Sequence, residues 1–345
     1  MYSRAIKVVA ACAIGLCLIV LPIVMARLQI VPRNGFPLFN QDSIRNAERT
    51  PAPITPKEES RLAALRIAGL HRDLSKMSQM IACLNDSNPT YVATGLHALE
   101  HLGNEQGIPD IDRVASGSNT DYIREEAKSA HARLLAETTD LSPTLPDERV
   151  QIKIDRYFSE EGLDKDKIVA GVLAFHSRGG SQGLSHEMNA LREVADMAYR
   201  DSSTGFLSSP QLQGLDYSQD PGAALKVRLA RMPQEGRLPW MINELANKKK
   251  IGKNEGYLLQ LAVDEGEAAS QAAGSKLREM DANREQYTYT GFSALFDVIR
   301  GVGDKRQTSL IAHFLNDQDT WIAYYAQQVY PSVKKGLGKQ YAVGY

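Results

Sequence analysis

Apolar side chains recur at helical spacing over much of the chain. Leu74, Met77, Ile81 and Leu84 step by three, four and three positions, which places them on one face of a helix. A polar turn follows, and Pro89 then suits the first turn of a second helix. The pattern therefore predicts two helices joined by a tight turn.

The same arrangement continues downstream. The apolar positions of the next two predicted helices are Val92, Leu96, Leu99 and Leu102, followed by Ile108, Ile111 and Val114. Gly103 separates these helices, as glycine commonly does after a helix C-terminus. A further helix is expected to begin at Asp121, so that Tyr91 and Tyr122 open equivalent helices 31 residues apart. Strand-like alternation is scarce, and the predicted fold class is all-α.

This part of the chain carries a recognisable order of residues. It reads Leu84-Asn85-Asp86, then Tyr91-Val92-Ala93, then Ala98-Leu99-Glu100-His101-Leu102-Gly103-Asn104, then Ile108-Pro109. An acidic turn, a β-branched residue, an alanine–leucine pair and a Leu-Gly helix end in this order resemble HEAT repeats of the short, phycobilisome-lyase-like kind. The resemblance covers about two repeats. It implies an α-solenoid of antiparallel helix pairs.

A similar order returns near the C-terminus. Leu315-Asn316-Asp317 and Thr320-Trp321-Ile322-Ala323 repeat the residue types of Leu84-Asn85-Asp86 and Thr90-Tyr91-Val92-Ala93. Tyr257 and Phe292 each follow a glycine and look like further aromatic helix starts. The spacings from Tyr257 to Phe292 and from Phe292 to Trp321 are 35 and 29 residues, which are typical of stacked helix pairs.

Proline and polar stretches divide the chain into six expected parts. They are a signal peptide or membrane anchor (1–30), a Pro-rich tether (31–57), HEAT-like repeats (58–137), a divergent helical middle with a long loop (138–222), a second block of HEAT-like repeats (223–335) and a flexible tail (336–345).

The N-terminus has the layout of an export signal or an anchor. Arg4 and Lys7 precede the apolar run Val8–Ala26, whose 19 residues approach the length of about 20 that spans a bilayer. One alternative is a single anchor in the cell membrane with the body outside the cytoplasm. The other is cleavage near Ala26, which gives a secreted or periplasmic protein. A lipid attached at Cys12 is a third, weaker alternative.

Composition excludes some classes of function. The 40 lysines and arginines are balanced by 41 aspartates and glutamates, so no global field attracts nucleic acid, and none is expected as a partner. The three cysteines are Cys12, Cys17 and Cys83, and two of them lie inside the apolar N-terminal run. A disulfide within the body and a cysteine-rich zinc site are therefore excluded.

One short motif would carry metal chemistry. His97-Ala98-Leu99-Glu100-His101 spells H-x-x-E-H, the zinc motif of inverted zinc peptidases, and histidines four residues apart share a helix face. No third ligand or two-lobed fold is evident, however, and Leu99 belongs to the buried stripe of a repeat helix. We expect His97, Glu100 and His101 to lie on the other faces of that helix, so no metal site, cofactor or catalytic residue is predicted.

Three further motifs have ordinary explanations. Gly179-Gly180-Ser181-Gln182-Gly183 is expected to be a turn between helices, because no strand precedes it and no lysine follows it. Lys248–Lys250 with Lys253 is expected to be a solvated loop. Ser332-Val333-Lys334-Lys335 matches S-x-x-K without any supporting motif.

Tyrosines near the C-terminus are the predicted partner-binding residues. They are Tyr287, Tyr289, Tyr324, Tyr325 and Tyr330, which cluster in sequence and cannot all face a core. The aromatic residues that open helices are expected instead to pack between repeats: Tyr91, Tyr122, Tyr257, Phe292 and Trp321.

These observations favour a membrane-anchored or exported scaffold, without enzymatic activity, that binds a protein partner on its solenoid surface. The alternative is an enzyme or cofactor-handling protein, since proteins with this kind of repeat include some that handle tetrapyrroles. Its chemistry would lie in the divergent middle, with His176, His186 and Glu187 as candidates. A third hypothesis is a self-associating envelope protein. Whether a small molecule binds is left open.

Overall fold

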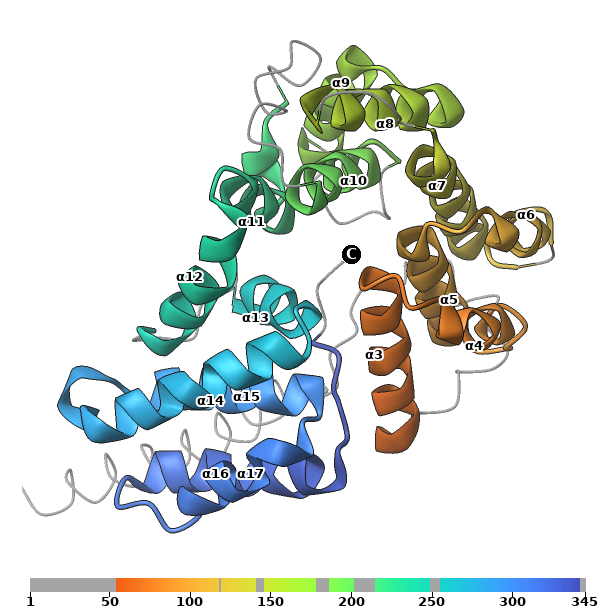
Figure 1. Cartoon of the computed structure of the whole chain (residues 1–345). Helices are drawn as coiled ribbons and strands as arrows, with labels where there is room; N and C mark the ends of the chain where they lie inside the picture. The colour runs from red at the N-terminus through yellow and green to blue at the C-terminus, as the bar shows by residue number, and fades with distance from the viewer. Residues whose placement is uncertain are drawn as a thin grey trace, which may run out of the picture. The chain divides into compact units, whose positions relative to one another are not determined.

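Helices make up all the regular structure in the part of the chain that the computed structural model describes. This part comprises residues 54–117, 119–140, 146–177, 186–201, 215–248 and 255–341, and it contains fifteen α-helices and no strand (Figure 1). All of it belongs to one compact unit, Asn40–Tyr345. The all-α prediction is confirmed.

Local signals set the ends of the first helices. These are α3 (Pro56–Leu70), α4 (Met77–Cys83), α5 (Pro89–Leu102), α6 (Ile108–Ser116) and α7 (Asp121–Thr138). Thr55 caps α3 through a capping box with Glu58, Asn88 caps α5, and Thr120 caps α7. Each cap satisfies backbone N–H groups that have no partner inside the helix.

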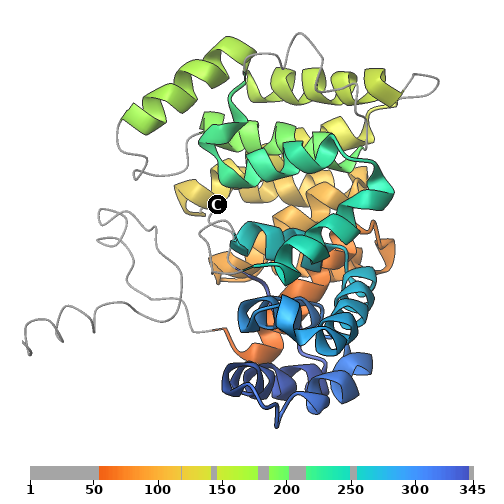
Figure 2. The same cartoon turned by 90° about the vertical axis from the view of Figure 1, so that its left-hand side faces the viewer.

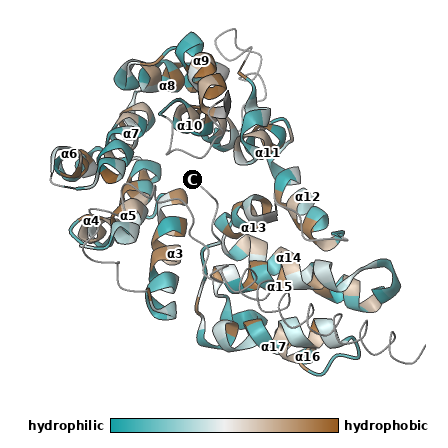
Figure 3. Ribbon diagram, turned by 180° about the vertical axis from the view of Figure 1, so that it is seen from behind, coloured by the Kyte–Doolittle hydropathy of each residue, from teal (hydrophilic) through white to brown (hydrophobic). Residues whose placement is uncertain are grey.

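The chain continues through ten more helices. They are α8 (Pro146–Glu161), α9 (Lys165–Ser177), α10 (His186–Arg200), α11 (Pro221–Ala230), α12 (Gln234–Ala246), α13 (Glu255–Asp264), α14 (Glu267–Ala282), α15 (Tyr289–Val302), α16 (Thr308–His313) and α17 (Thr320–Lys335). Hydrophobic and hydrophilic stretches alternate along them (Figure 3). Buried apolar side chains form three main clusters, spanning Leu62–Leu134, Ala132–Ala230 and Tyr199–Val333.

One type of link between helices occurs three times in the described part of the chain. A 3₁₀ turn capped by an acidic residue or asparagine follows α3, α5 and α15, and the caps are Asp73, Asn104 and Asp304. The residue before each cap has a positive φ: Arg72 (55°), Gly103 (68°) and Gly303 (72°). The same local geometry therefore recurs at both ends of the described body.

The first helix contacts the C-terminal part of the body. The Arg66 guanidinium on α3 pairs with Asp264 at the end of α13 at 2.8 Å, and His71 Nε2 lies 2.9 Å from the backbone oxygen of Asp264. The backbone N–H of Gly338 donates to Ser60 Oγ at 2.9 Å. Figures 1 and 2 both place α3 beside the C-terminal helices. The series of helices thus closes on itself.

The structure differs from the expected boundaries at two places. Pro56 and Lys57, assigned to the tether, form the first turn of α3, because proline suits this position and Thr55 caps it. Tyr341, assigned to the flexible tail, is fixed: its N–H donates to Gln260 Oε1 at 2.8 Å and its hydroxyl to the Asp297 carbonyl at 2.6 Å.

The predicted signal or anchor and nearly all of the predicted tether lie outside the described residues. Among the helices that are described, none combines the length and the apolar character needed to cross a membrane.

Candidate functional site

The helix that carries the H-x-x-E-H motif is enclosed. α5 contacts α3, α4 and α7, and the exposed fractions of Glu100 and His101 are only 7% and 5%. His97, Glu100 and His101 lie on a different side of α5 from Leu99, as expected, but this second side also faces the interior of the helical body.

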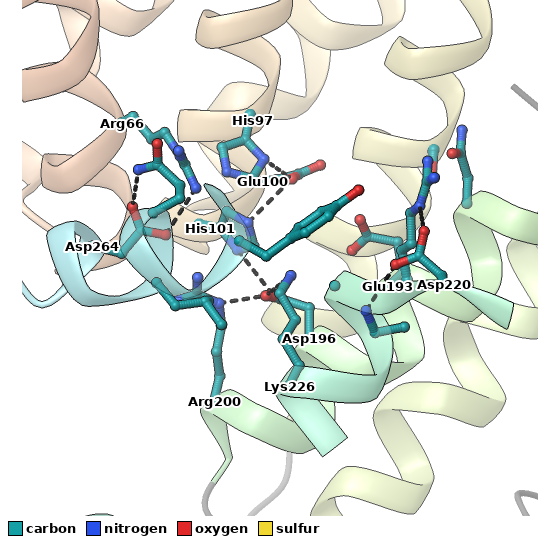
Figure 4. A pocket seen from close by; sticks show the side chains of 18 of the residues that line it. Arg66, His97, Glu100, His101, Glu193, Asp196, Arg200, Asp220, Lys226 and Asp264 are labelled. Carbon is teal, nitrogen blue, oxygen red and sulfur yellow. Dashed lines mark hydrogen bonds and ion pairs between the residues drawn. The ribbon is translucent and has the colours of Figure 1, made fainter. Parts of the chain in front are cut away.

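The polar side of α5 lines a cavity (Figure 4). The other walls come from α3, α7, α10, α11 and α13, so residues far apart in sequence meet there. About 100 Å³ is open to water-sized molecules, which is room for several waters or a small ligand. The charged and imidazole side chains of the wall are Arg66, His97, Glu100, His101, Glu126, Arg192, Glu193, Asp196, Arg200, Asp220, Lys226 and Asp264.

Every aspartate of the wall has a cationic partner. The ion pairs are Asp264–Arg66 at 2.8 Å, Asp220–Arg192 at 2.8 Å, Asp196–Arg200 at 2.7 Å and Asp196–Lys226 at 2.6 Å. Arg200 and Lys226 overcome the effect of burial and hold the pKa of Asp196 well below its usual range. Among the described residues of the wall, all four cationic side chains therefore form ion pairs with the three aspartates.

The glutamates of the wall are the surplus carboxyl groups. Glu193 pairs with Arg133 at 3.0 Å, but no lysine or arginine of the described residues forms an ion pair with Glu100 or Glu126. Burial raises the pKa of Glu100 and of the half-buried Glu126 to about 8, and that of Glu193 to about 7. The raised pKa values of Glu100 and Glu126 favour their protonated forms near neutral pH.

The two histidines converge on Glu100. His97 Nδ1 lies 2.8 Å and His101 Nε2 lies 3.3 Å from Glu100 Oε1. One candidate ligand atom from each of the three residues lies within 4.8 Å of the others, so the trio could hold a metal ion. Burial lowers the pKa of His97 to about 3 and that of His101 well below its usual value, so both imidazoles are neutral.

The second nitrogen of His101 is turned toward another helix. His101 Nδ1 is buried, makes no hydrogen bond to any described residue and lies 3.8 Å from Asp196 Oδ2 on α10. Across the wall, Arg192 Nη1 is likewise a buried donor without a hydrogen bond. The cavity wall thus contains an imidazole nitrogen and a guanidinium nitrogen that a ligand or a water could contact.

A separate aromatic surface lies at the N-terminal ends of α15 and α17. We define it as Tyr289, Trp321, Tyr324 and Tyr325. The Tyr289 ring stacks on Trp321 (centroids 5.8 Å apart) and on Tyr325 (6.3 Å), and Tyr324 meets Tyr325 edge to face at 5.4 Å. Tyr289, Trp321 and Tyr324 are 37%, 55% and 48% exposed.

Three of the five predicted partner-binding tyrosines belong to this aromatic surface. Tyr287 does not, since its hydroxyl donates to Glu279 at 2.9 Å, and Tyr330 packs partly against the core. Trp321 and Tyr122 are exposed rather than packed between repeats, whereas Tyr91 and Phe292 are buried as predicted. Trp321 precedes the first buried residue of α17, Ile322, so its side chain points away from the core.

Two of the three residues proposed for chemistry in the middle region, His186 and Glu187, do not line the cavity. His186 is exposed and pairs with Glu161 at 3.1 Å, and Glu187 is also absent from the wall. The side chain of His176, the segment 179–183 and Lys249, Lys250 and Lys253 lie outside the described residues. Lys248 and the Ser332–Lys335 segment are also distant from the wall residues in sequence and do not line it.

Sequence reasoning missed the residues that α10 contributes. A signal was present: Arg192, Asp196 and Arg200 are spaced by four, which places three charges in one stripe of a helix whose other positions are largely apolar. A charged stripe of this kind on a mostly buried helix indicates a polar interior site.

Comparisons with protein-family models, with curated proteins and with solved structures find no match to this chain.

Proposed function

We propose that this protein is a helical-repeat binding protein whose interior cavity holds a small ligand that carries positive charge. The observation behind this proposal is the pair Glu100 and Glu126, which face the cavity without a lysine or arginine partner among the described residues. A bound cation would replace the protons that these carboxyls hold in its absence. Arg192 Nη1 would donate a hydrogen bond to an oxygen atom of the ligand or of a water.

The repeat architecture is part of the same proposal. The link with a residue of positive φ and a capped 3₁₀ turn recurs after α3, α5 and α15, and helices one step apart in the series, such as α5 and α7 or α15 and α17, contact each other. These features support an α-solenoid of HEAT-like helix pairs. We further propose that the N-terminal segment anchors the body to the membrane or directs its export, with the body outside the cytoplasm.

A purely structural explanation accounts for part of the wall. Buried ion pairs such as Arg66–Asp264 hold neighbouring helices in one arrangement, and removing one partner of such a pair is costly. This explanation does not extend to Glu100 and Glu126, because a buried carboxyl without a cation weakens the fold instead of stabilising it.

Thermal unfolding of the purified full-length chain with three probes tests the proposal. Zn²⁺, Mg²⁺ and spermidine span soft, hard and organic cations, and at least one should raise the melting temperature. Glu126→Gln should lower the affinity for that probe by about tenfold, which corresponds to about 1.4 kcal/mol of binding free energy. Glu235→Gln, which changes an exposed carboxyl on α12, should leave the affinity for that probe unchanged. Equal responses of the two variants, or no response to any probe, would refute a cation site in the cavity.

The aromatic surface favours a second candidate function, that of a scaffold that binds a protein partner. Exposed tyrosine and tryptophan are enriched at interaction surfaces, since rigid rings bury much area at little cost in conformational entropy. The stacked Tyr289, Trp321 and Tyr325 rings present such a surface. We propose that an extended peptide segment of the partner lies across these rings.

Photo-cross-linking tests this second function. A benzophenone side chain at position 324, in the membrane-extracted full-length protein, should form one defined adduct, and Trp321→Ala should abolish it. The same group at position 122, which is also exposed, is the control. Identical adducts at both positions would contradict a dedicated aromatic binding surface.

A further inference from the structure

The cavity contains a cluster whose chemistry is more specific than surplus charge. His97, Glu100 and His101 are successive polar positions on one side of α5, and they converge with ligand atoms within 4.8 Å. Carboxylates alone would suit hard cations such as Mg²⁺ and Ca²⁺, whereas neutral imidazoles prefer Zn²⁺, Cu²⁺, Fe²⁺ or Ni²⁺.

We infer that this cluster is a site for one divalent transition-metal ion, with His97, Glu100 and His101 as protein ligands. This inference rests on the proposed cation-binding function and names the class of cation.

The distances between the ligand atoms are close to those around such an ion. Zinc bonds to imidazole nitrogen and carboxylate oxygen are about 2.0–2.2 Å long, so ligand atoms around one tetrahedral ion lie about 3.3–3.5 Å apart. The contacts of Glu100 Oε1 with His97 Nδ1 and His101 Nε2 are 2.8 and 3.3 Å. Small side-chain rotations would therefore open the trio enough to admit the ion.

A neighbouring carboxylate is placed to orient one of the ligands. His101 Nε2 faces Glu100, while Nδ1 on the opposite edge of the ring points at Asp196 from 3.8 Å without a hydrogen bond. Metal-binding histidines usually donate their second N–H to a carboxylate, which fixes the tautomer and leaves the first nitrogen as a ligand. A small ring movement on metal binding would complete this arrangement, with Asp196 as a positioning residue.

A further carboxyl group near the cluster also suits a metal ion. Glu126 lines the same cavity wall and would balance part of the positive charge of the ion.

The same trio could instead be a buried hydrogen-bonded group, with Glu100 bridging the two imidazoles and no ion involved. The two explanations differ in what Co²⁺ does. If the trio is a metal site, Co²⁺ binds with two nitrogen ligands at low coordination number. If it is only a hydrogen-bonded group, no stoichiometric ion binds there.

Cobalt titration of the chelator-treated full-length chain in mild detergent is the test. We expect one Co²⁺ per chain, the visible absorption of a four- or five-coordinate ion, and two imidazole ligands by X-ray absorption spectroscopy of the wild-type protein. His97→Asn and His101→Asn should each lower the affinity for Co²⁺ at least 100-fold. His131→Asn, on the exposed side of α7 where the imidazole pairs with Asp112, should bind normally. The spectroscopy on wild-type protein decides the matter even if a variant fails to fold.

The outcomes separate this inference from the function on which it rests. Absence of a stoichiometric ion, or an ion with oxygen ligands only, overturns the metal site. If spermidine or Mg²⁺ binds in that case and depends on Glu126, cation binding in the cavity still stands. If no cation binds at all, both proposals fail.

Discussion

The Arg133 side chain carries its charge entirely inside the protein. It is fully buried on α7 and pairs with Glu137 at 2.9 Å, Glu193 at 3.0 Å and Asp196 at 3.5 Å. Burial alone would raise the pKa of Glu137, but the nearby charges of Arg133 and Lys153 lower this pKa to about 2. One guanidinium behind the cavity therefore compensates several buried carboxylates.

Removing the Arg133 guanidinium should strongly destabilise the fold. Arg133→Met leaves buried carboxylates without their cation, and we expect the free energy of unfolding to fall by about 3–5 kcal/mol. Arg113→Met is the control, because Arg113 pairs with Asp110 in an exposed position, and its loss should cost less than about 1 kcal/mol. Urea unfolding of both variants gives the comparison, and similar losses would show that the buried pairs do not stabilise the fold.

At the scale of elements, the recurring helix links depend on a left-handed residue. Gly103 and Gly303 end α5 and α15 with φ of 68° and 72°, a conformation that costs a side chain about 1–2 kcal/mol. Their surroundings differ. A Cβ at Gly103 would have no neighbour closer than 3.8 Å, whereas a Cβ at Gly303 would lie 2.6 Å from the backbone nitrogen of Gly338.

The two glycines therefore make a matched pair of variants. Gly103→Ala should lower the free energy of unfolding by about 1 kcal/mol, from backbone conformation alone. Gly303→Ala should cost clearly more, since the backbone of Gly338 must also move. Chemical denaturation of both variants measures the difference, and an equal or smaller loss for Gly303→Ala would contradict the described packing of the C-terminal segment.

The helices could be predicted because their signals are local. Apolar spacing, Pro89 at the start of α5 and Gly103 after its end act within a few residues of the chain. The cavity could not be predicted in the same way. The sequence places Glu100 on another face of the helix than Leu99, but only the tertiary arrangement brings α10 and α13 to that face.

At the scale of the whole described body, closure is the main unexpected feature. A linear array of helix pairs leaves its terminal helices in contact with one neighbour only, so they open most easily. Here α3 contacts α5 on one side and also reaches α13 through Arg66 and Asp264. The cavity depends on this closure, because both of these residues belong to its wall.

Loss of the closing ion pair should release the first helix. In Arg66→Met, the backbone amides of α3 should exchange hydrogen faster, while those of α7 keep their rates. Lys128→Met, which removes an exposed pair with Glu125 on α7, is the control and should leave α3 unchanged. Unaltered exchange of α3 in Arg66→Met would mean that Asp264 does not hold it.

The account depends most on the claim that the cavity wall holds more carboxyl than cationic groups. A glutamate whose pKa rises from 4.5 to about 8 on folding stabilises the fold fully below pH 4.5, and this stabilisation is lost as the pH rises to 8. His97, whose pKa falls from 6.5 on folding, has the opposite pH dependence. Its stabilising contribution is complete above pH 6.5 and is lost only as the pH falls below that value. Between pH 6.5 and 8 the glutamates therefore determine how the free energy of unfolding changes with pH.

The direct measurement is the free energy of unfolding of the metal-free protein between pH 6.5 and 8, for the wild type and for Glu126→Gln. The wild type should lose stability as the pH rises, by up to about 2 kcal/mol for each surplus carboxyl. Glu126→Gln should lose less and be the more stable protein at pH 8. Parallel curves for the two proteins would contradict a surplus of buried carboxyl groups and, with it, the proposed cation site.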